Sequence, residues 1–412
     1  MKTRKNIIRT VILGLILSLG FVYAGTEFSP QDTSYHRDYP VVFAFRQDIR
    51  NSVVNSRTAG KLLFDAYYRG IAPQIGNKTL RNALGFFWSF TTTWSSTMWP
   101  HEFGHYLRAK QAGGDFYVEK VVFPMAFGVV DLPPDATIED ELLFVTGGFE
   151  ANFMISRDIQ HDYYRYNGLY NDELFTAFFH RVMYPAYTCL FVRMDPADPA
   201  NWLDSEGGII AMGDVASMAR LTWERTGGNV ILPDSSVAPE LVQFYNRSSL
   251  MGVLWNLADM NLYMQAAALF RGETNGRRPR HLIEKDHFKW SYGTLFNASV
   301  LGAELYLNQY MHIRDRFYSA YLKYGFPFRN YGIGAAVHDL VRSERFDLGL
   351  QVDLWHQEYY GNGLSAAAAL DLKLMHHIDL MAHIGWKTRG YVLGMPVESG
   401  MTGFLGLRYT PQ

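Results

Sequence analysis

The sequence predicts an α+β protein, in which a mostly helical segment is followed by an antiparallel β-barrel of about eight strands. Two changes of pattern along the chain support this prediction. Up to about residue 272, apolar residues recur with helical spacing. From about Lys289 onwards, apolar and polar residues alternate, which is the pattern of strands. We therefore divide the chain into residues 1–24, residues 25–272 and residues 285–412.

Composition describes a folded protein and excludes some classes of function. Of the 412 residues, 48% are hydrophobic and 19% are charged, and the net charge is −2. A protein that binds nucleic acid shows a basic face, so we expect no nucleic acid as a partner. Cys189 is the single cysteine in the sequence. This excludes an intramolecular disulfide and a zinc site built from cysteines.

The first 24 residues have the layout of a secretory signal peptide. Four basic residues precede an apolar run from Val11 to Val22. Val22-Tyr23-Ala24 then suits cleavage before Gly25. An uncleaved anchor is the alternative, but the run is short for a membrane span. We expect the mature chain to leave the cytoplasm for the cell envelope.

The stretch His101-Glu102-Phe103-Gly104-His105 is the strongest functional signal in the helical segment. Trp99-Pro100 lies just before it, and no helix breaker follows until Gly113-Gly114. In a helix, residues four positions apart share one face, so His101 and His105 can bind one zinc ion. Glu102 can accept a proton from the water that the ion activates. The stretch therefore predicts a Zn²⁺ cofactor and hydrolytic chemistry.

The surroundings of this stretch favour a metal site over two surface histidines. Large apolar residues precede it and others follow it: Phe86, Phe87, Trp88, Phe90, Trp94, Met98 and Trp99, then Val121, Val122, Phe123 and Met125. Polar groups in apolar surroundings are costly unless they are satisfied, and a metal ion satisfies both imidazoles.

A catalytic zinc ion has three protein ligands and a position open to water, so a third ligand is needed. We expect Glu150, which lies in a helical pattern from about Ile138 to Ile155 among apolar residues. A carboxylate there is costly to bury unless it is paired or bound to metal. A glutamate that faces solvent or pairs with Arg157 is the alternative.

Two aspartates and two further polar residues also belong to the candidate site. Asp214 is an acidic residue inside an apolar segment, and Asp204 lies in a predicted loop, so either can replace Glu150 as third ligand. Asn152 and His180 are candidates for polarising the carbonyl group of a substrate. A histidine among apolar residues is also typical of a core, so His180 has a structural alternative.

The two histidines with their glutamate resemble the zincin metallopeptidases, and a His-His-Glu site is of the gluzincin type. The segment Gly147–Asn152 is similar to the Ala-Gly-Pro-x-Ala-Asn segment of site-2 proteases. In that family a later aspartate, in a Leu-Asp-Gly context, completes the zinc site. Here Phe149 replaces the proline, and Leu203-Asp204 is followed by Ser205. These resemblances cover little beyond the segments quoted, and they imply zinc and a peptide or protein substrate.

The C-terminal alternation fits a small transmembrane barrel, because about eight runs of residues carry apolar side chains on one face. Leu350, Val352 and Leu354 alternate with Gln351 and Asp353, for example. Together with the export signal, this pattern resembles bacterial outer-membrane proteins, whose partner is lipid. A soluble sheet with one buried face gives the same alternation.

Taken together, these patterns predict an exported zinc metallopeptidase with a periplasmic catalytic domain and an outer-membrane barrel. His101, His105 and Glu150 would hold the zinc ion, and Glu102 would act as general base. Two alternatives stay open. One is a barrel-anchored binding or structural protein with a zinc site that performs no chemistry, and the other is an intramembrane protease similar to site-2 proteases.

Overall fold

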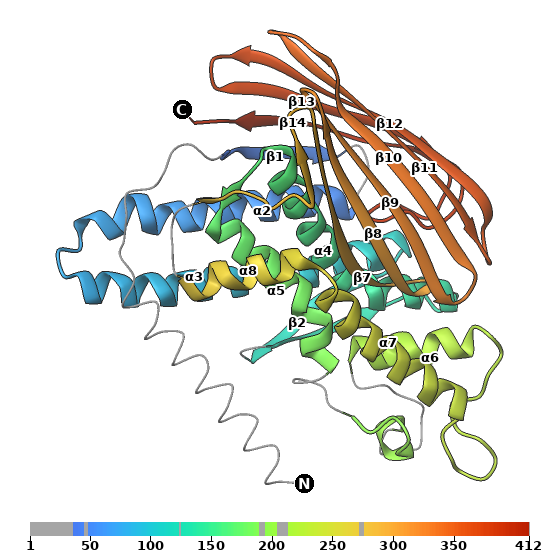
Figure 1. Ribbon diagram of the computed structural model, residues 1–412. Coiled ribbons are helices and arrows are strands. Elements are labelled where there is room, and N and C mark those ends of the chain that lie inside the picture. The colour runs from blue at the N-terminus through green and yellow to red at the C-terminus, as the bar shows by residue number, and fades with distance from the viewer. Residues whose placement is uncertain are drawn as a thin grey trace.

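The computed structural model describes residues 36–44, 48–122, 125–188, 194–203, 213–271 and 276–411. The protein is α+β, with a bundle of helices covered by one large antiparallel sheet (Figure 1). The predicted signal peptide, residues 1–24, lies outside the described residues, and so do Asp204 and Cys189.

The described helices of the bundle are α2 (Ile49–Asp65), α3 (Lys78–Gln111), α4 (Ile138–Arg165), α5 (Asn171–Ala186), α6 (Asp214–Glu224), α7 (Pro239–Leu257) and α8 (Met260–Arg271). The two longest, α3 and α4, form its centre. Thr137 and Asp140 form a capping box at the start of α4. α3 and α4 cross closely, because a Cβ on Gly104 would lie only 2.1 Å from the carbonyl oxygen of Gly147.

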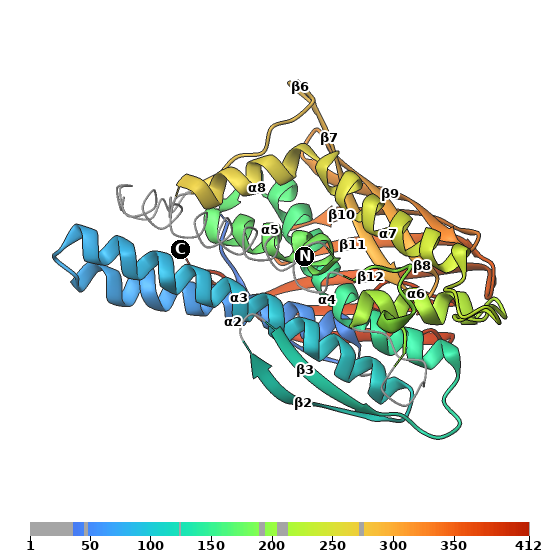
Figure 2. The ribbon, with the colours of Figure 1, turned by 90° about the horizontal axis from the view of Figure 1, so that it is seen from below.

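The helix that carries the two histidines begins much earlier than their local pattern suggests. The sequence places Pro100 just before this helix, whereas α3 runs continuously through Pro100. Proline has no N–H, so the Ser96 carbonyl loses its usual helical donor four residues later. Packing of α3 against α2, α4 and α5 outweighs this loss. The outer parts of α2 and α3 project beyond the sheet (Figure 2).

The large sheet has ten strands, which pair in the order β1-β14-β13-β12-β11-β10-β9-β8-β7-β6. They are β1 (Tyr39–Ala44), β6 (Ile283–Lys285), β7 (Phe288–Ser299), β8 (Gly302–Ile313), β9 (Arg316–Pro327), β10 (Asn330–Arg342), β11 (Phe346–Gln357), β12 (Gly361–Met375), β13 (Ile378–Lys387) and β14 (Gly400–Tyr409). Two small antiparallel sheets of two strands each are separate from it: β2 (Asp115–Val122) with β3 (Met125–Asp131), and β4 (Leu169–Tyr170) with β5 (Gly276–Arg277).

The antiparallel sheet is confirmed, and its eight long strands, β7 to β14, lie in the segment predicted for them. The strand pairing does not show the predicted closure into a barrel, since β1 and β6 are the two ends of the hydrogen-bonded order among the described strands. β1 comes from the segment assigned to the helical domain. It pairs with β14 in the register Val41 opposite Leu407, so the two predicted domains share one sheet.

Strands β11 and β13 turn apolar side chains outward and polar side chains toward the helices. On β11, Leu350, Val352 and Leu354 are 42%, 48% and 51% exposed, whereas Asp353 is 2% exposed. On β13, Trp386 is exposed and the next residue, Lys387, is fully buried. A soluble sheet with one face on the core shows the opposite arrangement.

Aromatic contacts join the inner face of the sheet to α4. The rings of Phe153 and Tyr306 lie 4.9 Å apart, and those of Tyr164 and Tyr310 lie 4.6 Å apart. α4 is therefore held between α3 on one side and the sheet on the other. Within the described part of the chain, no helix is both long enough and apolar enough to cross a membrane.

Candidate metal centre

Three side chains from two helices converge beside α4. His101 and His105 are buried on one face of α3, with their Nε2 atoms 3.2 Å apart. The carboxylate of Asp214 lies 3.0 Å from His101 Nε2 and 3.4 Å from His105 Nε2. Asp214 is the first residue of α6, and 113 positions separate it from His101. This is the one group of three ligand-type side chains found among the described residues.

The spacing of these atoms fits a zinc ion. Tetrahedral zinc with ligand bonds of about 2.1 Å separates its ligand atoms by about 3.4 Å, and the three pairs of atoms are 3.0 to 3.4 Å apart. Gly148 on α4 supplies the space. A Cβ there would lie 2.6 Å from the Nε2 atoms of both His101 and His105. Two imidazole nitrogens and one carboxylate oxygen are a donor set that zinc accepts.

Without a metal ion, Asp214 and His105 behave as an ion pair. Burial disfavours the protonated imidazole of His105, but the Asp214 carboxylate outweighs burial and raises the pKa of His105 to about 9. Burial likewise opposes ionisation of Asp214, and the two histidines overcome it and hold its pKa well below the usual value. A metal ion at this site therefore competes with a proton on His105.

Glu150, the expected third ligand, lies elsewhere. Its carboxylate accepts hydrogen bonds from Arg108 at 2.7 to 2.9 Å, and both side chains are fully buried. The backbone N–H of Gly394 donates a further bond to it at 2.6 Å. The requirement that a buried carboxylate be satisfied is met by this cation and not by a metal. The structure thus replaces Glu150 with Asp214 beside the histidines, while the other alternative, Asp204, falls outside the described residues.

Asn152 and His180 lie behind His101, where they fix the orientation of its ring. The amide of Asn152 lies 3.0 Å from His101 Nδ1 and 2.9 Å from His180 Nδ1. The amide nitrogen donates to His101 Nδ1 and the amide oxygen accepts from His180 Nδ1, so Asn152 links the two rings and holds His101 with its Nε2 atom toward Asp214. Burial lowers the pKa of His180 to about 3, which keeps this ring neutral. His105 is fixed in the same way, because its Nδ1 lies 2.7 Å from the Phe144 carbonyl oxygen.

Two further polar groups near the metal-binding atoms, among the described residues, are Glu102 and Tyr187. Glu102 is 9% exposed, and its charge helps to raise the pKa of His105. Tyr187, at the end of α5, accepts a 3.3 Å hydrogen bond from the N–H of Asp214. Burial, then Asp214, and then Glu102 raise its pKa well above the usual value, so the phenol keeps its proton. Sequence reasoning missed Tyr187, because no spacing rule links it to the histidines.

The geometry therefore unites three of the predicted residues, namely His101, His105 and Asp214, with Glu102 beside them. The chain matches no protein-family model and no curated protein.

Proposed function

We propose that this protein is a zinc-dependent hydrolase of peptide bonds, with His101, His105 and Asp214 as the metal ligands. The observation that carries the proposal is the position of the Asp214 carboxylate, 3.0 Å and 3.4 Å from the two histidine Nε2 atoms. A hydrogen-bonded pair of histidines alone has many structural explanations. A carboxylate from a distant helix that reaches both Nε2 atoms has far fewer.

Each residue of the site has its own role in the proposed reaction. Bound zinc supplies a Lewis acid that makes water more acidic and polarises a carbonyl group. Glu102 accepts the proton of the attacking water and gives it to the leaving amine. Tyr187 keeps its proton and is a donor for the oxygen of the substrate carbonyl. Asn152 and His180 act instead by holding His101, since both lie on its Nδ1 side.

A His-His-Asp ligand set supports one resemblance over the other. A gluzincin site takes a glutamate, and Glu150 is already paired with Arg108. The similarity to site-2 proteases implies an aspartate from later in the chain, and Asp214 is such a residue, although it lies in the sequence Gly213-Asp214-Val215 and not in a Leu-Asp-Gly context. We therefore propose the site-2-like ligand order for this centre.

We further propose that the large sheet anchors the protein in a lipid bilayer, as an outer-membrane barrel after export. The support is the direction of its side chains. Exposed apolar residues occupy the outer face of neighbouring strands, and in the paired register Ile333 of β10 lies between Leu322 and Leu354. Buried polar residues occupy the inner face. Lipid-facing sheets carry this arrangement of side chains.

The decisive experiment compares Glu102→Gln with Glu344→Gln, a matched loss of one carboxylate at an exposed turn of the sheet. Both variants should keep about one zinc ion per chain. Hydrolysis of an unfolded protein substrate should fall by about 10²–10⁴-fold in Glu102→Gln only, which is the usual contribution of a general base. Equal activity in both variants would remove Glu102 from the mechanism. Zinc without hydrolysis of any peptide by the parent would favour the non-catalytic alternative.

A further inference from the structure

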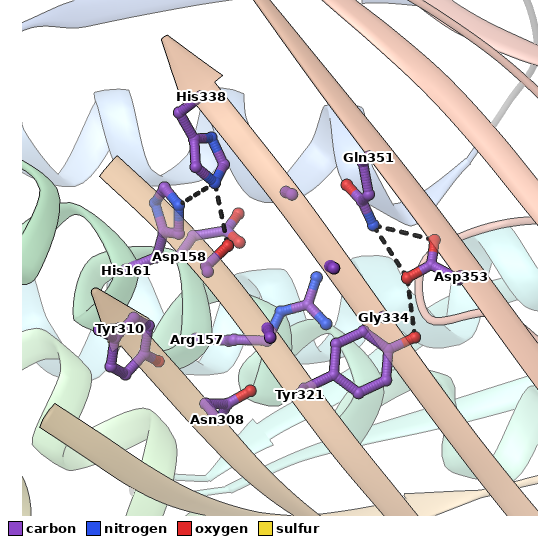
Figure 3. Close-up of a pocket in the computed structure, with 14 residues that line it drawn as sticks. Arg157, Asp158, His161, Asn308, Tyr310, Tyr321, Gly334, His338, Gln351 and Asp353 are labelled. Carbon is purple, nitrogen blue, oxygen red and sulfur yellow. Dashed lines mark hydrogen bonds between the residues drawn. The ribbon is translucent and has the colours of Figure 1, made fainter. Parts of the chain in front are cut away.

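A polar cavity, apart from the proposed metal centre, lies between α4 and the inner face of the sheet. It has a volume of about 160 Å³ and is lined by residues of α4 and of strands β8 to β11. His161 and His338 line it, with their Nε2 atoms 2.8 Å apart. Figure 3 shows the guanidinium group of Arg157 in the middle of the space, with Asn308 and Tyr321 around it. None of the proposed metal ligands lines this cavity.

The cavity contains hydrogen-bond donors that no described residue satisfies. A guanidinium group has five N–H donors, and Arg157 makes no hydrogen bond or ion pair within the described chain. The side-chain nitrogen of Asn308 also lacks a partner, although this residue is only 4% exposed. A smaller adjoining cavity shares Arg157 and brings in Arg50, whose side chain likewise has no hydrogen-bond partner among described residues. Arg157 and Arg50 are half-buried and Asn308 is buried, and buried donors without acceptors are unusual in native proteins.

Other arginines in the interior of this molecule are paired, which makes Arg157 and Arg50 exceptional. Each of the following arginines lies within 3.0 Å of a carboxylate oxygen: Arg37 with Asp172, Arg108 with Glu150, Arg181 with Asp259, and Arg408 with Asp379. The fold therefore supplies an acidic partner where an arginine serves only to stabilise the interior.

The acidic residues of the cavity do not fill this role. The carboxylate of Asp353 accepts hydrogen bonds from Tyr321, Gln351 and Ser365 at 2.7 to 3.2 Å, so its oxygens are already used. Asp158 also lines the cavity, but it forms no ion pair with its neighbour Arg157 within 4.0 Å in the described structure. The Asp158 carboxylate likewise has no hydrogen-bond partner among the described residues, so the cavity holds one unsatisfied carboxylate beside the donors of Arg157 and Asn308.

We infer that this cavity binds a small oxyanion, a phosphate or a carboxylate group, through Arg157 and Asn308, with Arg50 adding positive charge from the adjoining side. The planar fork of a guanidinium group matches two oxygens of such an anion. The volume is sufficient, because a cavity of about 150 Å³ can hold a molecule as large as benzene. The anion is either free in solution or the headgroup of a phospholipid.

Thermal unfolding of the full chain at constant ionic strength tests this inference without reference to hydrolysis. Inorganic phosphate, exchanged against chloride, should raise the melting temperature of the parent in a saturable way. Arg157→Gln should raise the apparent Kd for phosphate about tenfold or more, and Asn308→Leu should raise it by a smaller factor. Arg157→Gln should fold normally, since Arg157 makes no hydrogen bond to lose.

Arg165→Gln is the matched control. Arg165 lies on the same helix but pairs with Asp339 and does not line the cavity. This variant should keep the full response to phosphate, even if its own melting temperature is lower. Dihexanoyl phosphatidic acid below its micelle concentration serves as the lipid probe. A response to this probe alone, lost in Arg157→Gln, supports the site with a lipid headgroup as its ligand. If neither probe stabilises the parent, or if Arg157→Gln responds like the parent, the inference is overturned.

Discussion

Replacing Gly148 with alanine should empty the proposed metal site without unfolding the protein. Gly148 lies within α4, where alanine is favoured over glycine by about 1 kcal/mol. Its new methyl carbon would start 2.6 Å from His101 Nε2 and from His105 Nε2, and 3.0 Å is the closest contact that such carbons normally make. The imidazoles must therefore move by a few tenths of an ångström, and the methyl group occupies the space that an ion bound to both nitrogens needs.

The assay is zinc content and zinc affinity of purified full-length protein, together with its melting temperature. Gly148→Ala should retain less than about a tenth of the zinc at metal concentrations that saturate the parent, because two ligands are displaced at once. Gly85→Ala is the control, since it lies in α3 and its added carbon meets only the side chains of Tyr67 and Tyr68, the nearest atom at 3.2 Å. This control should bind zinc like the parent. Full zinc occupancy in a folded Gly148→Ala protein would refute the placement of the ion between the two histidines.

Three further predictions separate the remaining parts of the proposal. Glu150→Gln should lower the free energy of unfolding by about 3–5 kcal/mol, because it leaves Arg108 buried without its anion, but the folded variant should still bind zinc. Asp214→Asn should abolish zinc binding. The reverse pattern would restore Glu150 as the ligand. The affinity for zinc should rise as the pH rises from 6.5 to about 9 and then level off, because the metal must displace the proton of His105; zinc titrations test this. In the metal-free protein, the stabilisation from that proton is complete below pH 6.5 and is lost as the pH passes about 9, which melting curves test. Val352→Arg should cost about 2–4 kcal/mol of unfolding free energy in vesicles if the outer face of the sheet meets lipid, but only about 0.5 kcal/mol if that face meets water.

Patterns that span one element could be predicted from the sequence, and contacts between distant elements could not. The i, i+4 spacing of His101 and His105 is a property of a single helix, so their common face follows from local geometry. Alternation over β7 to β14 is equally local, and the antiparallel sheet was predicted from it. Asp214 reaches the histidines through the packing of α6 against α4, which joins residues 113 positions apart. No short-range pattern distinguishes Asp214 from the other aspartates of the chain.

The expectation for Glu150 shows that local reasoning can identify a carboxylate that needs compensation without identifying the group that compensates it. Its carboxylate is buried and must be compensated, as the apolar surroundings indicate, but the compensation comes from Arg108. Arg108 follows His105 by three positions, so it lies on the same face of α3 as the histidines. The face of α3 that meets α4 therefore carries two histidines and one arginine. The facing side of α4 places a glycine, a glutamate and an asparagine against them. Gly148 leaves room beside the histidines, Glu150 neutralises the arginine, and Asn152 orients His101, so α4 supports the proposed metal centre without supplying a ligand to it.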